Sequence, residues 1–256
     1  MKFADLRIAA CQNLLQTYVE LGTAAGARPV EETAGFRAYA SLTVHPICNF
    51  AIDLDLSPHA ARQLAEIATE KPSFCVYRSP SDKPEHIDEV LERAGFERAY
   101  SLTMMIADGQ IRNESIGLQR VNDPGERVEV ARFMTDQFFS RQNEAFRRVV
   151  SDATASADSL SLYQAWSGRQ RVACVMLSEG EVLGLYNLCV HPTFRGIGWG
   201  ISTVQSVLSL AAKTKRHVTL QCEPRLQSWY EHLGFEVIGA IDVFDLAERR
   251  KRDILL

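Results

Sequence analysis

Residues 190–200 read Val190-His191-Pro192-Thr193-Phe194-Arg195-Gly196-Ile197-Gly198-Trp199-Gly200. An apolar run, Leu183 to Val190, comes before them, and the pattern from Ile201 to Lys213 is that of an amphipathic helix. The stretch therefore predicts a strand, a turn and the start of a helix. Glycines let the backbone adopt positive φ and approach a ligand closely, and the first N–H groups of a helix have no partner within it. A loop of this kind predicts an anion site, such as a site for a phosphate group.

Two well-known phosphate loops fit these residues poorly. The Walker A loop needs Lys followed by Ser or Thr after its last glycine, whereas Ile201 and Ser202 follow Gly200. The dinucleotide fingerprint needs the spacing Gly-x-Gly-x-x-Gly and an acidic residue about 20 positions further on. Here the glycines alternate with other residues, and the downstream stretch from Lys213 to Arg216 is basic.

The residues that do form a known pattern are Arg195-x-x-Gly198-x-Gly200, preceded by Val190-x-Pro192. They resemble the pyrophosphate loop of the GNAT superfamily of acyl-CoA-dependent N-acyltransferases. A second stretch, Tyr230-Glu231-His232-Leu233-Gly234-Phe235, is similar to the Tyr-x-x-x-Gly-Phe element of that family, and it follows one further apolar run. Two motifs in the family's order favour this resemblance over the alternative, a glycine-rich turn before an ordinary amphipathic helix.

The resemblance implies acetyl-CoA as the acyl donor and direct attack by an amine within a ternary complex, with no covalent acyl-enzyme. Tyr230 is then the expected general acid, because a phenol near the sulfur can protonate the departing thiolate; the alternative is a packing aromatic beside Trp229. Arg195 would either place a cation near the pyrophosphate or cap the loop. Glu223 stands where the family pattern has an asparagine, and its carboxylate can still accept a hydrogen bond from the pantetheine arm. The expected cofactor-binding residues are Leu188, Cys189, Val190, Arg195, Gly196, Ile197, Gly198, Trp199, Gly200, Ile201 and Glu223.

The general base stays open at this point. Glu179 and Glu181 lie on the turn before the central strand, and His191 is of the residue type that titrates near neutral pH but can equally face solvent. Cys189 invites a nucleophile interpretation, which is disfavoured because no second histidine or acid lies at a diagnostic spacing. A chain of water molecules could replace a dedicated base.

Composition limits the class of protein. The chain has 256 residues, of which 46% are hydrophobic and 23% charged, as in globular proteins with a core of their own. Its net charge of −4 gives no general reason to bind nucleic acid or an anionic membrane. No apolar run approaches the ~18–20 residues that span a bilayer, and charges near the N-terminus argue against an export signal. Six cysteines without a Cys-x-x-Cys pair predict reduced, buried thiols and no metal site. We therefore expect a cytoplasmic protein with neither nucleic acid nor membrane as partner. The resemblance to GNAT proteins adds the expectation of a monomer or homodimer acting on a small-molecule or peptide amine.

The chain also divides into two similar parts. Gly95-Phe96 and Gly234-Phe235 each follow a predicted helix and precede a predicted strand. At the same offset, Leu56 and Leu91 stand in place of Arg195 and Tyr230, so the first part lacks both marks. We expect a degenerate GNAT-like domain at 1–112, a GNAT N-acetyltransferase domain at 113–256, and one cofactor per chain. The degenerate copy would serve for structure, for dimer-like packing or as a wall of the acceptor site, and the alternative is an unrelated α/β domain.

The expected fold is a mixed α/β fold around an α+β mixed sheet, with Trp199 packing against the first part. Helices are expected at 8–21, 58–70, 84–94, 127–139, 143–157, 201–213 and around Tyr230, and strands at 38–44, 47–54, 74–78, 97–107, 116–122, 160–166, 171–177, 183–190, 218–222 and 236–246.

Overall fold

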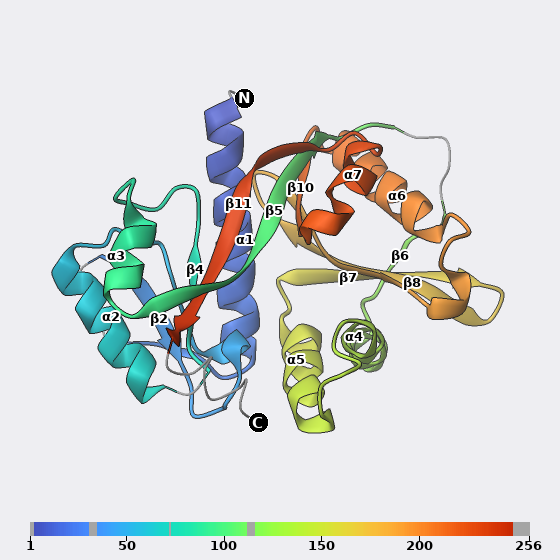
Figure 1. Cartoon of the computed structure of the whole chain (residues 1–256). Helices are drawn as coiled ribbons and strands as arrows, with labels where there is room; N and C mark the ends of the chain where they lie inside the picture. Colours follow the sequence, from blue (N-terminus) through green and yellow to red (C-terminus); the bar gives the residue numbers. More distant parts are fainter. Residues whose placement is uncertain (1–2, 31–34, 72, 112–115, 248–256) are drawn as a thin grey trace.

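The structure, a computed structural model, describes residues 3–30, 35–71, 73–111 and 116–247. Its backbone forms one sheet of 11 strands with helices on both faces (Figure 1). The strands are β1 (Arg28–Pro29), β2 (Arg37–Ala40), β3 (Phe50–Ile52), β4 (Cys75–Arg78), β5 (Phe96–Asp108), β6 (Gln119–Arg120), β7 (Leu160–Ser167), β8 (Gln170–Glu179), β9 (Leu183–Val190), β10 (His217–Cys222) and β11 (Glu236–Leu246). The helices are α1 (Phe3–Ala24), α2 (Pro58–Glu70), α3 (Ile87–Arg93), α4 (Pro124–Phe138), α5 (Glu144–Ser156), α6 (Trp199–Lys213) and α7 (Gln227–Glu231), with short 3-10 turns η1 (Pro46–Cys48), η2 (Pro192–Phe194) and η3 (Pro224–Leu226).

The sheet has two lobes that repeat one order of elements. Its strand order is β1-β2-β3-β4-β11-β5-β10-β9-β8-β7-β6. In the first lobe β2 and β3 are antiparallel, and β3 continues through α2 into the parallel strand β4. In the second lobe β8 and β9 are antiparallel, and β9 continues through α6 into the parallel strand β10. The two-part architecture expected from the sequence is therefore present, and Figure 1 shows the lobes on either side of α1.

The last strand of each half lies in the sheet of the other half. β5 follows α3 in the chain, yet it pairs antiparallel with β10 of the second lobe. β11 follows α7, yet it pairs antiparallel with β4 of the first lobe. The two exchanged strands also pair with each other along the middle of the sheet. The expected border between residues 112 and 113 lies outside the described residues.

The two Gly-Phe elements take the same conformation. Gly95 has φ +94° and Gly234 has φ +95°, a left-handed backbone that favours glycine. Each glycine ends a short helix, α3 or α7. The phenylalanines that follow, Phe96 and Phe235, are both buried in the hydrophobic core. The sequence correspondence between these elements is thus also a structural one.

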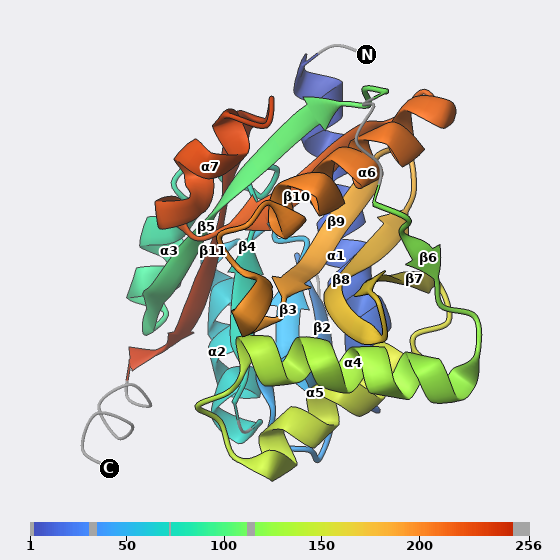
Figure 2. The same cartoon turned by 90° about the vertical axis from the view of Figure 1, so that its right-hand side faces the viewer.

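Helix α1 covers one face of the sheet across both lobes (Figures 1 and 2). Its Leu14 belongs to a hydrophobic cluster that includes Phe50 from the first lobe and Met176 from the second. The opposite face is covered by α2 and α3 in the first lobe and by α6 in the second. Because side chains alternate along a strand, Val175 and Leu177 of β8 pack on the α6 side while Met176 packs on the α1 side.

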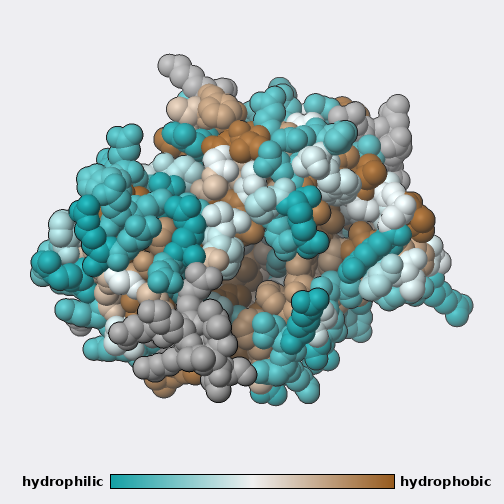
Figure 3. Space-filling model, in the orientation of Figure 1, coloured by the Kyte–Doolittle hydropathy of each residue, from teal (hydrophilic) through white to brown (hydrophobic). Residues whose placement is uncertain are grey.

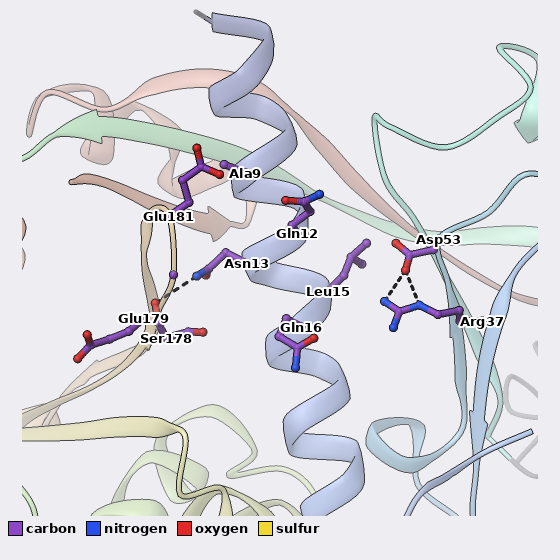
Figure 4. A pocket seen from close by; sticks show the side chains of 11 residues that line it. Ala9, Gln12, Asn13, Leu15, Gln16, Arg37, Asp53, Ser178, Glu179 and Glu181 are labelled. Atoms are coloured by element: carbon purple, nitrogen blue, oxygen red, sulfur yellow. Dashed lines mark hydrogen bonds and ion pairs between the residues drawn. The ribbon is translucent and has the colours of Figure 1, made fainter. Parts of the chain in front are cut away.

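A buried asparagine ties α1 to the second lobe. The Asn13 side-chain amide donates to the backbone carbonyl of Ser178 at 3.2 Å (Figure 4). It also donates to the Val182 carbonyl at 3.3 Å, on the other side of the β8–β9 turn. The Tyr186 hydroxyl donates to the Asn13 Oδ1 atom at 2.6 Å. A Cβ atom at Gly184 would lie 2.1 Å from that same oxygen, so the close approach requires a glycine there.

Asn13→Ala is expected to lower the free energy of unfolding by about 2–3 kcal/mol, because it leaves buried carbonyls and a buried hydroxyl without partners. Urea denaturation of both proteins measures the loss. Gln12→Ala, one position earlier on the exposed side of α1, is the control and should stay near wild type. Equal midpoints for all three proteins would contradict the role given to Asn13.

Three predicted strands are shorter in the structure. The strand expected at 47–54 is reduced to β3, because Pro46–Cys48 form the turn η1 before it. The strand expected at 38–44 ends at Ala40, because the next residues form a loop held by the buried Asn49. The Ser41 N–H donates to the Asn49 Oδ1 atom at 2.9 Å, and the Asn49 amide donates to the Thr43 and His45 carbonyls. The strand expected at 116–122 is reduced to β6, whose two residues pair with β7.

His45, in this loop, predicts a loss of stability on acidification. Its imidazole is buried against Phe146 of α5, with 4.0 Å between ring centroids, and burial lowers its pKa to about 4. His45 takes up a proton near pH 6.5 in the unfolded chain but only near pH 4 in the folded protein. The neutral, buried His45 therefore contributes its full share to the free energy of unfolding above pH 6.5, and that share is lost as the pH falls toward 4. A shift of this size corresponds to at most about 3 kcal/mol.

His45→Asn should remove that pH dependence, because an asparagine can still accept the Ile47 N–H that the His45 Nδ1 atom accepts at 3.0 Å. Urea denaturation at pH 7 and pH 4.5 should show a smaller loss for the variant than for the wild type. Burial raises the pKa of Asp82 to about 6, so this group titrates in the same pH range. Because Asp82 is present in both proteins, its effect cancels in the comparison. An identical loss in the two proteins would exclude His45 as the cause.

Candidate active site

The glycine loop ends at a helix N-terminus that no side chain caps. Gly196 has φ +77° and Gly198 φ +96°, both in the left-handed region, as the sequence predicts. Gly198 is the N-cap of α6 and has no side chain that could accept a hydrogen bond from the N–H groups of the first turn. The first hydrogen bond within the helix runs from the Ser202 N–H to the Gly198 carbonyl, at 3.0 Å. The first N–H groups of α6 are therefore available to an anion, at the positive end of the helix dipole.

The corresponding helix of the first lobe, α2, has an N-terminus that is capped by a side chain. The Ser57 hydroxyl oxygen accepts from the Ala60 N–H at 3.1 Å, at the N-terminus of α2. A serine cap of this kind occupies a donor that a phosphate would need. The two lobes thus share the strand–helix–strand arrangement but differ at the helix N-terminus.

The parallel strands of the second lobe separate toward the loop. Pairing between β9 and β10 is confined to Leu183 with Val218 and Gly184 with Thr219. Further along, β9 has a bulge opposite β8, and Asn187 in this bulge has φ +49°. A gap therefore opens between β9 and β10 over the second half of β9, and backbone groups of β9 face it without a strand partner.

Val190 presents its backbone to this gap. The His191 N–H donates to the Val172 carbonyl on the β8 side, so the Val190 N–H, one residue earlier, points to the opposite side. The Val190 carbonyl accepts from the Arg195 Nε atom at 3.0 Å, and the same guanidinium donates to the Gln137 side chain at 2.8 Å. Arg195 thus holds the strand end and loop together while keeping its charge beside the loop.

A pocket of about 550 Å³ lies over the glycine loop, and we call it the loop pocket. It is bordered by the end of β9, the loop, the start of α6, and η3 with α7. Its lining residues are Leu188, Val190, Arg195, Gly196, Gly198, Gly200, Ile201, Leu226, Trp229 and Tyr230. A pocket with an apolar wall and a cationic, N–H-rich end suits a ligand that joins an apolar arm to phosphate groups.

A second pocket of about 300 Å³, the α1 pocket, lies on the α1 side of the same gap. It is bordered by α1, the end of α4, β5 and the separating parts of β9 and β10. In the view of Figure 3 the surface is hollowed between the lobes, and the hollow is apolar. Leu188, Leu226 and Tyr230 line both pockets. The gap between β9 and β10 therefore joins the two pockets through these shared side chains.

Tyr230 lies where the pockets meet. Helix α7 holds it, with its ring edge-on to Trp229 at 4.6 Å and to Phe235 at 5.6 Å between centroids. The side chain is 7% exposed, and burial, followed by the nearby Cys222, raises its pKa above the usual value of 10. The phenol is therefore protonated at neutral pH and can donate a proton.

The structure brings most predicted cofactor residues to the loop pocket, but not all. The lining includes Leu188, Val190, Arg195, Gly196, Gly198, Gly200 and Ile201. Ile197 points outward and is 67% exposed, and Glu223 lines the α1 pocket instead. The Trp199 ring packs edge-on against Phe194 at 6.2 Å, beside a small cluster that contains Val172 and Val190. The expectation that Trp199 packs against the first lobe is wrong, because η2 brings Phe194 next to it.

Cys189 is buried opposite Cys174 on β8. Burial, and next the Cys174 thiol, raise the pKa of Cys189 well above its usual value, so the thiol stays protonated and is no nucleophile. All six cysteines are buried and unpaired, as the sequence predicts.

The candidate bases from the sequence lie elsewhere. Glu179 and Glu181 line a different pocket, of about 590 Å³, beside α1 (Figure 4). His191 packs against Phe133 of α4, at 6.2 Å between centroids, and lines neither the loop pocket nor the α1 pocket. Glu223 is the one carboxylate among the described residues that line the two pockets. It is half exposed and forms an ion pair with Arg225.

Sequence reasoning named Leu188, Glu223 and Tyr230 but missed the other residues of the α1 pocket. Leu14, Thr17, Tyr18 and Leu21 form a stripe on one face of α1, a segment that the sequence predicted only as a helix at 8–21. Gln221 lies in an otherwise mostly apolar strand, and a polar residue in such a run is the one signal that could have marked the pocket.

Two further findings concern the described residues alone. They contain no group of three or more His, Cys, Asp or Glu side chains placed to hold a metal ion. None of the helices resolved in these ranges combines the length and the apolar character of a membrane span.

Comparisons with known proteins agree with this geometry. Residues 158–237 match the family model described as an acetyltransferase (GNAT) domain. A GCN5-related N-acetyltransferase from Kribbella flavida has a TM-score of 0.68 at 14% identity, covering 94% of this chain and 96% of that one. A conserved protein of unknown function from Staphylococcus epidermidis has a TM-score of 0.65 at 15% identity, covering 86% and 94%. A tandem GNAT protein from the clavulanic acid biosynthesis pathway has a TM-score of 0.55 at 13% identity, covering 82% and 77%. No curated protein matches the sequence.

The mixed sheet, the gap between β9 and β10 and the uncapped glycine loop belong to one mixed α/β fold. Residues 158–237 thus resemble a GNAT acetyltransferase domain, and the fold is like that of GNAT proteins across most of the chain. Proteins of the family that this model describes transfer, in general, an acetyl group from acetyl-CoA to an amine.

Proposed function

We propose that this protein is an N-acetyltransferase in which an amine attacks acetyl-CoA directly within a ternary complex, with no covalent acyl-enzyme. The observation that carries the proposal is that two pockets on opposite sides of the sheet meet in the gap between β9 and β10, with Tyr230 lining both. The loop pocket would hold the acyl donor and the α1 pocket the acceptor. When the two reactants are held on either side of one gap, the amine can reach the thioester directly, and no side chain has to carry the acetyl group between them.

The chain's own groups fit CoA in the loop pocket. The uncapped N-terminus of α6 and the Arg195 guanidinium favour the pyrophosphate. Leu188, Leu226 and Trp229 provide apolar surface for the pantetheine arm, and the Val190 N–H faces the gap where a thioester carbonyl would lie. A fixed N–H at that position would polarise the carbonyl. When bound, acetyl-CoA supplies a thioester that an amine can attack.

Tyr230 is the proposed general acid. The new C–N bond forms as the C–S bond breaks, and the Tyr230 hydroxyl gives its proton to the departing sulfur. The attacking nitrogen loses its extra protons to water at the mouth of the α1 pocket, where the Glu223 carboxylate lies. Tyr230 regains its proton from water after product release. No side chain is assigned as an obligatory base.

We further propose that residues 1–112 are a degenerate GNAT copy that binds no CoA and that residues 113–256 are the catalytic domain. The repeated order of elements, the matched glycines and the serine cap of α2 support this division. One CoA should bind per chain. The degenerate copy contributes α1 and β5 to the α1 pocket, which suits a role as a wall of the acceptor site.

Calorimetric titration with acetyl-CoA, followed by a thiol-release assay over a broad panel of amines, tests the proposal. Saturable binding at one site per chain, with release of CoA that depends on an amine, is the expected result. The alternative function is a non-catalytic acyl-CoA-binding or regulatory module, because a base is unassigned and Glu223 replaces the usual asparagine. Binding without turnover on any amine would favour that alternative, and no binding at millimolar acetyl-CoA would exclude both.

A further inference from the structure

The α1 pocket is almost without charge. Of the sixteen described residues that line it, Glu223 is the one Asp, Glu, Lys, Arg or His, and it lies at the half-exposed mouth. The phenols of Tyr18, Tyr186 and Tyr230 are buried, and burial raises the pKa of each above its usual value. The interior of the pocket therefore offers no partner for a second charge on a ligand.

The walls around this interior are apolar and fixed in place. Leu14, Tyr18 and Leu21 project from one face of α1, and the Tyr18 ring is stacked on Tyr77 with 4.2 Å between centroids. Leu102 of β5 and Phe138 at the end of α4 close other sides. At about 300 Å³ the pocket lies at the small end of ligand sites, too small for a peptide segment with its side chains.

Two polar groups of the pocket already have a partner in Asn13 of α1. The Tyr186 hydroxyl donates to the Asn13 Oδ1 atom, and the Thr17 hydroxyl donates to the Asn13 carbonyl at 2.7 Å. Gln221 differs, because its buried side-chain nitrogen lies close to Tyr186 but meets hydrogen-bond distance and angle limits with none of the described residues. A buried amide donor without a partner is costly, and a ligand that accepts a hydrogen bond from it would relieve that cost.

We propose that the acceptor is a primary monoamine on a compact, uncharged and mainly apolar body that bears one hydrogen-bond acceptor for the Gln221 amide. This inference rests on the acetyltransferase function proposed above. Glu223 attracts the ammonium form at the mouth, and the neutral amine and its uncharged amide product both suit the interior. Diamines are disfavoured because their second charge would be buried without a partner, and amino acids because their carboxylate, next to the reacting nitrogen, would lie beside the Glu223 carboxylate.

Matched amines test the charge rule. The value of kcat/KM for phenethylamine should exceed that for the amino acid phenylalanine, and that for hexylamine should exceed that for diaminohexane, each by at least about 100-fold. Faster turnover of the amino acid or of the diamine would overturn the inference while leaving the acetyltransferase function in place. If acetyl-CoA binds but no amine of either kind is acetylated, the proposed function itself fails.

A variant tests the role of Gln221. Wild-type enzyme should favour para-methoxyphenethylamine over the para-methyl analogue, and Gln221→Leu should reduce that ratio by about tenfold, to near one. Gln221→Met is a second variant of similar size, in case the leucine variant folds poorly. Gln205→Leu is the matched control, because Gln205 also has a buried amide atom without a partner but lies on α6 outside both pockets. An unchanged ratio in both Gln221 variants, or an equal change in the control, would overturn the assignment of Gln221.

Discussion

The Tyr230→Phe enzyme is expected to turn over at least about 100-fold more slowly than the wild type while binding CoA with unchanged affinity. The substitution removes only the hydroxyl, and the ring contacts with Trp229 and Phe235 remain. Stability and the shape of both pockets should therefore be kept. Because only the leaving sulfur needs the proton, the loss should appear in kcat, with little change in the KM for either substrate.

Steady-state thiol release and CoA titration measure the two quantities separately. Tyr163→Phe is the matched control, since Tyr163 packs beside the same hydrophobic cluster but lines neither pocket. Because burial raises the pKa of Tyr230 above 10, the phenol should stay protonated across pH 6 to 9 and cause no fall in wild-type kcat there. An undiminished rate in Tyr230→Phe would exclude the acid role and shift attention to solvent as the proton source.

Gly198→Val is expected to weaken CoA binding by at least about 100-fold, the second large effect. At φ +96° a β-branched residue is a conformational outlier, so the loop must change its backbone to accept it. A changed backbone would redirect the N–H groups that begin α6, and these are the groups proposed to hold the pyrophosphate.

The control for this variant is unusually close. Gly95 has φ +94°, and an added Cβ would meet nothing within 4 Å at either glycine. Gly95→Val should thus cost similar stability, about 1–3 kcal/mol, without affecting CoA affinity. Calorimetric titration with CoA and urea denaturation of the two variants separate binding from folding. Comparable loss of affinity in both variants would mean that global destabilisation, rather than the loop, is responsible.

Local elements were largely predictable from the sequence because their signals are local. The span Leu183–Val190 is predicted and observed with the same bounds, since an apolar run ending at Pro192 leaves little freedom. The helix at Pro58–Glu70 is likewise marked by its serine cap and first-turn proline. The segment after Ala40 was predicted as strand and is a loop, because the side-chain amide of Asn49 takes over backbone partners that a strand would supply.

The candidate site was predicted only where its chemistry belongs to the backbone. The glycines and their positive φ at 196 and 198 follow from residue type, so the loop could be found. The α1 pocket could not, because it depends on a helix at one end of the chain meeting β9, β10 and β5. Leu14 and Leu21 look the same in sequence whether they fill a core or line a cavity. Pairing of β5 with β10 depends on contacts between residues more than a hundred positions apart, which no local pattern encodes.

The exchange of final strands has a consequence for how the chain is made. On a ribosome, β4 is complete long before β11, so its edge stays open until nearly the whole chain has been synthesised. An open strand edge can pair with other chains, and nascent protein is most exposed to this in the interval. Once β11 has been synthesised, its covalent connection to the rest of the chain gives it an effective concentration near β4 of the order of millimolar. A separate fragment would have to be present at that concentration to pair as well. The order of translation therefore makes the first half wait for the second, and the C-terminal strand closes the sheet for both.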